Sequence, residues 1–233
     1  MTVAIINETG DKMKDNFRPD FYRHLAFAAV GGFFGAYAIL CRCGMLASAQ
    51  TMNLLHLTIA ALQGDVKALL LYFGAFVLYL VGMACTVLVP HYLHIDIRRA
   101  VPFVDIAAAL VLTVMSPDIN VILGLYPIFF AMSLQWCAFS GANGYVSATI
   151  FSTNNTKQAT LALSEYITDG DKRHFGKMWF YVFTLLVFHV GATVSFFAVK
   201  LMNTRGAWMV IPLAILAYFT VLNEDKANKK QAV

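Results

Sequence analysis

Eight apolar blocks, joined by short polar connections, make up most of this 233-residue chain. They cover approximately residues 24–40, 45–62, 66–89, 100–115, 119–139, 145–167, 178–201 and 207–222. A membrane-spanning helix needs about 20 apolar residues, and these blocks meet or approach that length. Only 13% of the residues are charged, against about 25% in a typical soluble domain. The sequence therefore predicts an all-α, polytopic membrane protein and argues against a soluble enzyme.

The charged residues gather at residues 11–23, 169–177 and 224–230. Because Lys and Arg are retained on the cytoplasmic side of a membrane, residues 1–23 and residues 223–233 are predicted to be cytoplasmic segments. Residues 1–23 contain no apolar core before a cleavage site, so no cleavable signal peptide is expected. The basic residues form no single soluble face, so nucleic acid is not expected as a partner.

The second and sixth blocks differ from the others because they begin with polar residues. Ser48 and Gln50 open the second block, and Ser147 and Thr149 open the sixth, which remains polar through residues 152–157. Either block could span the membrane, or enter and leave it on one side as a broken helix. The chain would then have eight or six spans, and the distribution of Lys and Arg satisfies both arrangements. The third and fourth blocks are expected to end at Pro90 and before Pro117.

The two unusual blocks occupy matching places in an internal repeat. Residues 35–38 align with residues 135–138, residues 51–53 with 153–155, residues 63–65 with 169–171, and Gly82 with Gly191. The offsets of 100, 102, 106 and 109 drift slowly, as small insertions would make them. The sequence thus predicts two tandem repeats of about four helical blocks each, residues 24–117 and 118–222. The repeats would run parallel if the unusual blocks span the membrane, and inverted if they re-enter.

Several of these segments resemble one family. Residues 31–37 (GGFFGAY) and 45–55 (MLASAQTMNLL), with residues 131–135 (AMSLQ) and 151–155 (FSTNN), resemble the YoaK family, also called DUF1275 or UPF0700. The resemblance implies a small multi-pass protein of the bacterial inner membrane, and it implies no particular activity. The family usually has an acid where this chain has Gly35, and a glycine where it has Met52 and Asn154. We therefore expect no ion coupling at position 35 and no obligatory positive φ at positions 52 and 154.

Polar side chains at membrane depth usually face the bundle interior or a cavity. The predicted substrate-binding residues are of this kind, and they are Gln50, Thr51, Asn53, His56, Gln135, Thr153 and Asn155. Interrupted segments in corresponding positions of two repeats point to a transport site. The alternative is that these amides and hydroxyls only join helices. Among the acids, Asp105 has the position most compatible with the bilayer interior.

The predicted function is that of a transporter or facilitator of a small polar solute or an ion, with its site at the junction of the repeats. The alternative is a non-catalytic scaffold or complex subunit. An intramembrane enzyme is less favoured, because the sequence contains no HExxH or GxSxG motif. No catalytic residue, metal site or cofactor is expected, and Cys41, Cys43, Cys85 and Cys137 have no paired metal spacing. The expected partners are the lipid bilayer and the solute, and a homo-oligomer is left open.

Overall fold

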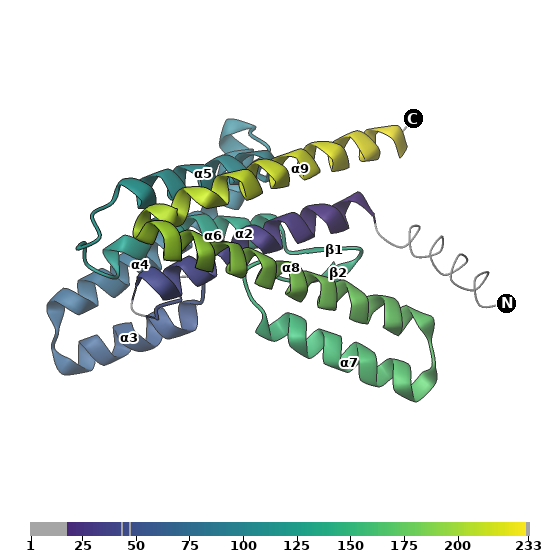
Figure 1. Cartoon of the computed structure of the whole chain (residues 1–233), viewed down its shortest axis with the longest axis horizontal. Coiled ribbons are helices and arrows are strands. Elements are labelled where there is room, and N and C mark those ends of the chain that lie inside the picture. The colour runs from purple at the N-terminus through teal and green to yellow at the C-terminus, as the bar shows by residue number, and fades with distance from the viewer. Residues whose placement is uncertain (1–17, 43, 47, 232–233) are drawn as a thin grey trace.

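The computed structural model describes residues 18–42, 44–46 and 48–231. Most of the predicted segment 1–23, as well as Cys43, lies outside these residues. The described chain is almost entirely helical (Figure 1). Three helical stretches are long and apolar enough to cross a membrane, namely Pro19–Cys41, Val66–Leu93 and Lys172–Lys230, and a shorter apolar one is Leu123–Ala138. The prediction of a helical membrane protein is confirmed.

The two halves of the chain contain the same order of major helices. The N-terminal half consists of α2 (Pro19–Cys41), α3 (Gln50–Gln63), α4 (Val66–Leu93) and α5 (Ile97–Val114). The C-terminal half consists of η1 (Leu123–Leu125), α6 (Tyr126–Ala138), β1 (Gly141–Ala142), β2 (Tyr145–Val146), α7 (Thr153–Asp169), α8 (Lys172–Met202), η2 (Asn203–Val210) and α9 (Ile211–Gln231). Figure 1 shows the hairpin of α3 and α4 at one end of the molecule and the hairpin of α7 and α8 at the other.

The two hairpins turn by the same local chemistry. Gly64 ends α3 with φ 70° and Gly170 ends α7 with φ 71°, a left-handed conformation that glycine adopts without steric cost. The next residue in each turn begins the following helix: the carboxylate of Asp65 accepts the N–H of Ala68, and that of Asp171 accepts the N–H of Arg173. A short polar side chain at this position satisfies a backbone donor that the helix leaves free.

The halves interlock by exchanging their first helices. The helix α2 packs mainly against α8 and α9 of the C-terminal half, and α6 packs mainly against α4 and α5 of the N-terminal half. Within each half, α3 packs on α4 and α7 packs on α8, while α5 and α9 pack on each other. The core therefore lies between the halves and not inside either one.

Glycines allow these crossings to be close. A Cβ on Gly32 would clash with the carbonyl of Phe188, and a Cβ on Gly191 would clash with the carbonyl of Ala29, so the backbones of α2 and α8 nearly touch. A Cβ on Gly82 of α4 would likewise clash with the Ser133 hydroxyl on α6. Small residues at helix interfaces permit such contact in membranes.

Three sequence-based expectations about element boundaries were wrong. Pro90 does not end the third block, because α4 continues through it to Leu93. The helices of the second and sixth blocks begin only at Gln50 and Thr153, and the described residues just before them are not helical. A small antiparallel hairpin, with Gly141 opposite Val146, also occurs in the connection before the sixth block and at its start, where no strand was expected.

Replacement of Gly191 by Ala should destabilise the fold by about 1–3 kcal/mol, because the new methyl group overpacks the crossing of α2 and α8. The matched control is Gly176→Ala on the same helix, where a Cβ meets nothing within 4 Å. That change should be neutral or stabilising by about 0.4–1 kcal/mol. Thermal unfolding of the detergent-purified protein measures both, and equal midpoints would refute this account of the crossing.

Candidate functional site

Two non-helical segments lie between helices at corresponding places in the two halves. We call residues 44–46, 48 and 49, just before α3, the N-terminal break, and residues 147–152, just before α7, the C-terminal break. Backbone without helical hydrogen bonds is tolerated at membrane depth only where it is buried in protein or lines a wet cavity. The side chains of Ser48, Ser147 and Thr149 in these breaks are buried.

A chain of hydrogen bonds holds the C-terminal break. The Nε2 atom of His24 on α2 lies 2.9 Å from Ser147 Oγ, which in turn donates to Asn155 Oδ1 at 2.9 Å. The Nδ2 group of Asn155 donates to the carbonyls of Ala148 at 2.8 Å and Phe151 at 3.1 Å. Since the single hydroxyl proton of Ser147 goes to Asn155, His24 must donate from Nε2. The other ring nitrogen, Nδ1, has no partner among the described residues.

Gln135 joins α6 and α2 to the same break. Its Nε2 group donates to the Phe27 carbonyl at 3.1 Å and to Thr149 Oγ1 at 2.8 Å, and the side chain is fully buried. Because both bonds use the amide nitrogen, they fix the amide orientation and leave Oε1 without a partner in the described part of the chain. The cluster around the C-terminal break thus presents two bare acceptors, His24 Nδ1 and Gln135 Oε1.

The cluster around the N-terminal break is less completely bonded. Asn53 Nδ2 donates to Gln50 Oε1 at 3.0 Å and to the Tyr72 carbonyl at 3.3 Å, and the Tyr79 hydroxyl donates to the Ser48 carbonyl at 3.3 Å. Within the described residues, Asn53 Oδ1, Gln50 Nε2 and Ser48 Oγ have no partner although they are buried. A buried polar group without a partner costs about 1–3 kcal/mol, so these atoms mark places that an added ligand or water would stabilise.

The remaining predicted residues lie outside these clusters. Thr51 and Thr153 are exposed on α3 and α7, so they do not face the interior as expected. The helical repeat turns them away from the buried Asn53 and Asn155, two positions further along. His56 is half-buried, and its ring stacks on Tyr72 with centroids 5.1 Å apart.

The structure does not bring the two sets of predicted residues into one hydrogen-bonded group. Across the described ranges, no hydrogen bond joins the two clusters, and Trp136 on α6 lies between them instead. Its ring packs against Tyr79 at 6.4 Å and against Phe151 at 5.2 Å between centroids. Tyr79 and Phe151 each contact one cluster through the hydrogen bonds above, so Trp136 links the clusters by packing alone.

Sequence reasoning did not select His24, Ser48, Ser147 or Thr149 as site residues. His24 stands near the start of an apolar block, where a polar residue is normally interfacial, and its depth becomes evident only because α2 extends back to Pro19. The available signal was the cluster of small polar residues at the start of the sixth block, which contains both Ser147 and Thr149.

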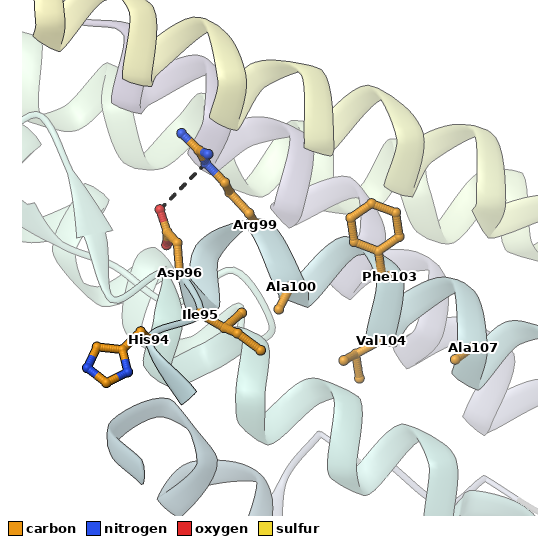
Figure 2. A pocket seen from close by; sticks show the side chains of 8 residues that line it. All are labelled: His94, Ile95, Asp96, Arg99, Ala100, Phe103, Val104 and Ala107. Carbon is orange, nitrogen blue, oxygen red and sulfur yellow. Dashed lines mark ion pairs between the residues drawn. The ribbon is translucent and has the colours of Figure 1, made fainter. Parts of the chain in front are cut away.

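A shallow groove of about 620 Å³ lies elsewhere, along the outer face of α5 and the turn before it. Figure 2 shows its lining, which consists of His94, Ile95, Asp96, Arg99, Ala100, Phe103, Val104 and Ala107. None of the predicted site residues belongs to it. In the described part of the chain, no three His, Cys, Asp or Glu side chains are grouped so that they could hold a metal ion.

A model of the family described as "Protein of unknown function (DUF1275)" matches residues 24–222. No curated protein and no solved structure matches the chain.

Replacement of Asn155 by Ala should destabilise the protein by about 1–3 kcal/mol, because the carbonyls of Ala148 and Phe151 lose their donor inside the core. Thr153→Ala, on the exposed side of the same helix, should change stability by less than about 0.5 kcal/mol. Thermal unfolding in detergent compares the two. An Asn155→Ala protein as stable as the parent would show that these hydrogen bonds do not hold the C-terminal break.

Proposed function

The chain belongs to the DUF1275 family, and we propose that it is a transporter or facilitator of a small polar solute or an ion. Its site would lie at the junction of the two halves, between the N-terminal and C-terminal breaks. The observation that carries the proposal is the presence of buried, unpartnered polar atoms beside both breaks, notably Asn53 Oδ1 and Gln135 Oε1. Transport sites built from broken helices at the interface of two repeats have this arrangement.

Three of the unpartnered atoms favour one kind of solute. Asn53 Oδ1, Gln135 Oε1 and His24 Nδ1 are acceptors in the geometry above, whereas Gln50 Nε2 is a donor and Ser48 Oγ can be either. A solute with several N–H or O–H donors, such as an amine or a polyol, would satisfy the three acceptors. Trp136, Tyr79 and Phe151 would separate the two groups of acceptors, so a bound solute would displace or rotate the indole ring.

Ion pairs support six crossings instead of eight. Arg98 at the start of α5 pairs with Asp225 near the end of α9 at 2.9 Å, and Arg99 pairs with the same carboxylate. Residues joined in this way lie on one side of the membrane, so an even number of crossings must separate them. The helices α5, α6, α8 and α9 give an even number if α7 re-enters. If α7 crossed as well, the number would be odd.

Helix length supports the same topology. The 14 residues of α3 extend about 21 Å at 1.5 Å per residue, which falls short of a hydrocarbon core of about 30 Å. The helix α6 by itself is as short, but η1 precedes it directly and lengthens the apolar helix to Leu123–Ala138. In this arrangement α3 and α7 are half-helices that enter from opposite sides, and the halves of the chain are inverted repeats.

The positive-inside rule then assigns the sides. The basic residues at the end where α2 begins and α9 ends would be Arg18, Arg23, Arg98, Arg99, Lys172, Arg173, Lys177, Lys226, Lys229 and Lys230. The opposite end would carry Arg42, Lys67, Lys200 and Arg205. We therefore propose that both termini are cytoplasmic, in the bacterial inner membrane that the family resemblance implies.

Single cysteines at Lys67 and Lys172 test the topology, in a background without Cys41, Cys43, Cys85 and Cys137. Both positions are exposed at the hairpin turns. A membrane-impermeant thiol reagent applied to intact cells should label Lys67→Cys, and should label Lys172→Cys only after the membrane is opened. Protection of both cysteines in intact cells would instead support eight crossings.

Thermal unfolding against a panel of ions, amines, polyols and amino acids tests the function. A ligand that binds the folded state stabilises it by about 2.7 kcal/mol at a hundredfold excess over Kd. The stabilisation should disappear in Asn53→Ala and in Gln135→Ala, which remove the unpartnered oxygens. It should persist in Thr51→Ala, the exposed control on α3.

A stabilising ligand that is unaffected by Asn53→Ala and Gln135→Ala would reject these residues as the site. The absence of any stabilising ligand across the panel would favour the scaffold function, in which the polar residues only join helices.

A further inference from the structure

Asp105 is a buried acid to which the proposed solute site gives no role. It lies on α5, its side chain is fully buried, and neither carboxyl oxygen has a hydrogen-bond partner among the described residues. An ionised carboxylate without a partner is very costly to bury, so such a group keeps its proton instead. We propose that Asp105 is a proton-binding site that is loaded in this conformation and releases its proton to water when the helices packed on α5 rearrange.

The surroundings of Asp105 are apolar. The helix α5 packs mainly against η2, α6 and α9. The buried residues that η2 and α9 contribute, up to the charged end of α9, are Gly206, Ala207, Val210, Ala214, Ala217 and Val221. The neighbouring buried residues of α5 itself are Val101, Pro102, Ala108 and Ala109. None of these side chains can donate a hydrogen bond to a carboxylate.

Charged groups on the packed elements have other partners or are exposed. On α9, Glu224 pairs with Arg23 at 2.8 Å, and Asp225 pairs with Arg98 at 2.9 Å. Arg98 precedes Asp105 by seven residues, which places this ion-pair layer about 10 Å away along the helix. On η2, the side chain of Arg205 is exposed.

The uncharged titratable groups on these elements, and the buried Ser133, have other contacts or are exposed. On α6, the Tyr126 hydroxyl donates to the Leu71 carbonyl, the Ser133 hydroxyl donates to the Phe130 carbonyl, and Cys137 is exposed. Gln135 is bonded as described above. On α9, Tyr218 packs against Phe103, with ring centroids 5.1 Å apart. On α4, which touches α5 only slightly, the Tyr79 hydroxyl bonds to Ser48. None of these groups forms a hydrogen bond with Asp105.

A hollow beside the end of α5 offers a route for the released proton. It has a volume of about 510 Å³, and its lining is Thr113, Pro117, Met202, Asn203, Thr204, Arg205 and Trp208, of which four have polar side chains besides the indole of Trp208. Thr113 lies eight residues beyond Asp105, about 12 Å along the helix. Separation of α5 from η2 would extend this hollow towards Asp105. The O–H bond would then break, a water molecule would accept the proton, and the remaining carboxylate would be hydrated.

This inference deepens the proposed function by naming the proton as the coupling ion, but its test requires no solute. Infrared difference spectra of the full-length protein, acid minus alkaline, should contain a C=O band of a protonated carboxyl group in an apolar environment. The band should shift when aspartate is labelled with ¹³C, and it should be absent in Asp105→Asn. It should persist in Asp118→Asn, the control at an exposed carboxyl group. Asp105→Glu, which keeps the acid, should move the band without abolishing it.

The pH dependence of stability distinguishes loss of the Asp105 proton from misfolding of the variants. An unfolded aspartate ionises near pH 3.9, so the folded parent, which retains its proton, should lose stability as the pH rises above that value. Asp105→Asn has no proton to lose and should not show this loss. The parent and the variant should therefore be about equally stable in acid, and the variant should be the more stable at higher pH.

Two results would overturn the inference. A carboxylate signal from Asp105 at every pH would mean that the group is ionised and has a partner. A protonated signal that never titrates before the protein unfolds would mean that the proton is structural and is not exchanged. Either result would leave the solute site between the two breaks intact. Failure of the solute panel would likewise leave the titration of Asp105 to be decided by the spectra.

Discussion

The insertion of α2 into the C-terminal half is the contact on which the rest of the structure depends. Gly32 and Gly191 bring α2 against α8, His24 and Phe27 anchor the C-terminal break, and Tyr37 donates to the Thr204 carbonyl at 2.8 Å. One helix therefore fixes both the packing of the core and the shape of the segment beside the candidate site. A single overpacked glycine in this helix pair would disturb both at once.

The two breaks have matching positions, but the asparagines beside them differ in how many of their polar atoms are hydrogen-bonded. Asn155 uses both its amide groups within the C-terminal break, whereas Asn53 leaves its oxygen unpartnered in the described chain. A residue that is fully bonded contributes stability, and one with a bare acceptor can also contribute to binding. The corresponding asparagines thus differ in bonding: Asn155 is hydrogen-bonded through both amide atoms, and Asn53 keeps a free acceptor that the proposed solute could use.

Much of the fold could be predicted from the sequence because membrane helices are defined by composition and length. The matching turns at Gly64 and Gly170, and the corresponding places of Gly82 and Gly191 in the two halves, could also be found from the sequence. The orientation of Thr51 and Thr153 could not be predicted, because polar residues lie on several sides of both helix starts and no single polar face shows which side is buried. The role of His24 depends on Ser147, which is 123 residues away, and no local pattern reports such a contact.

Charged contacts are distributed unevenly along the molecule, and this bears on how it could move. The described ion pairs between α2, α5 and α9 gather where α2 begins and α9 ends. At the opposite end α2 meets η2 through the hydrogen bond from Tyr37 to Thr204, and a hollow lies beside the end of α5 and η2. Opening at the ion-paired end would require charges to separate while they are partly buried, which is costly. Opening between α5 and η2 would separate none of these ion pairs, so the movement proposed to admit water to Asp105 would avoid this cost.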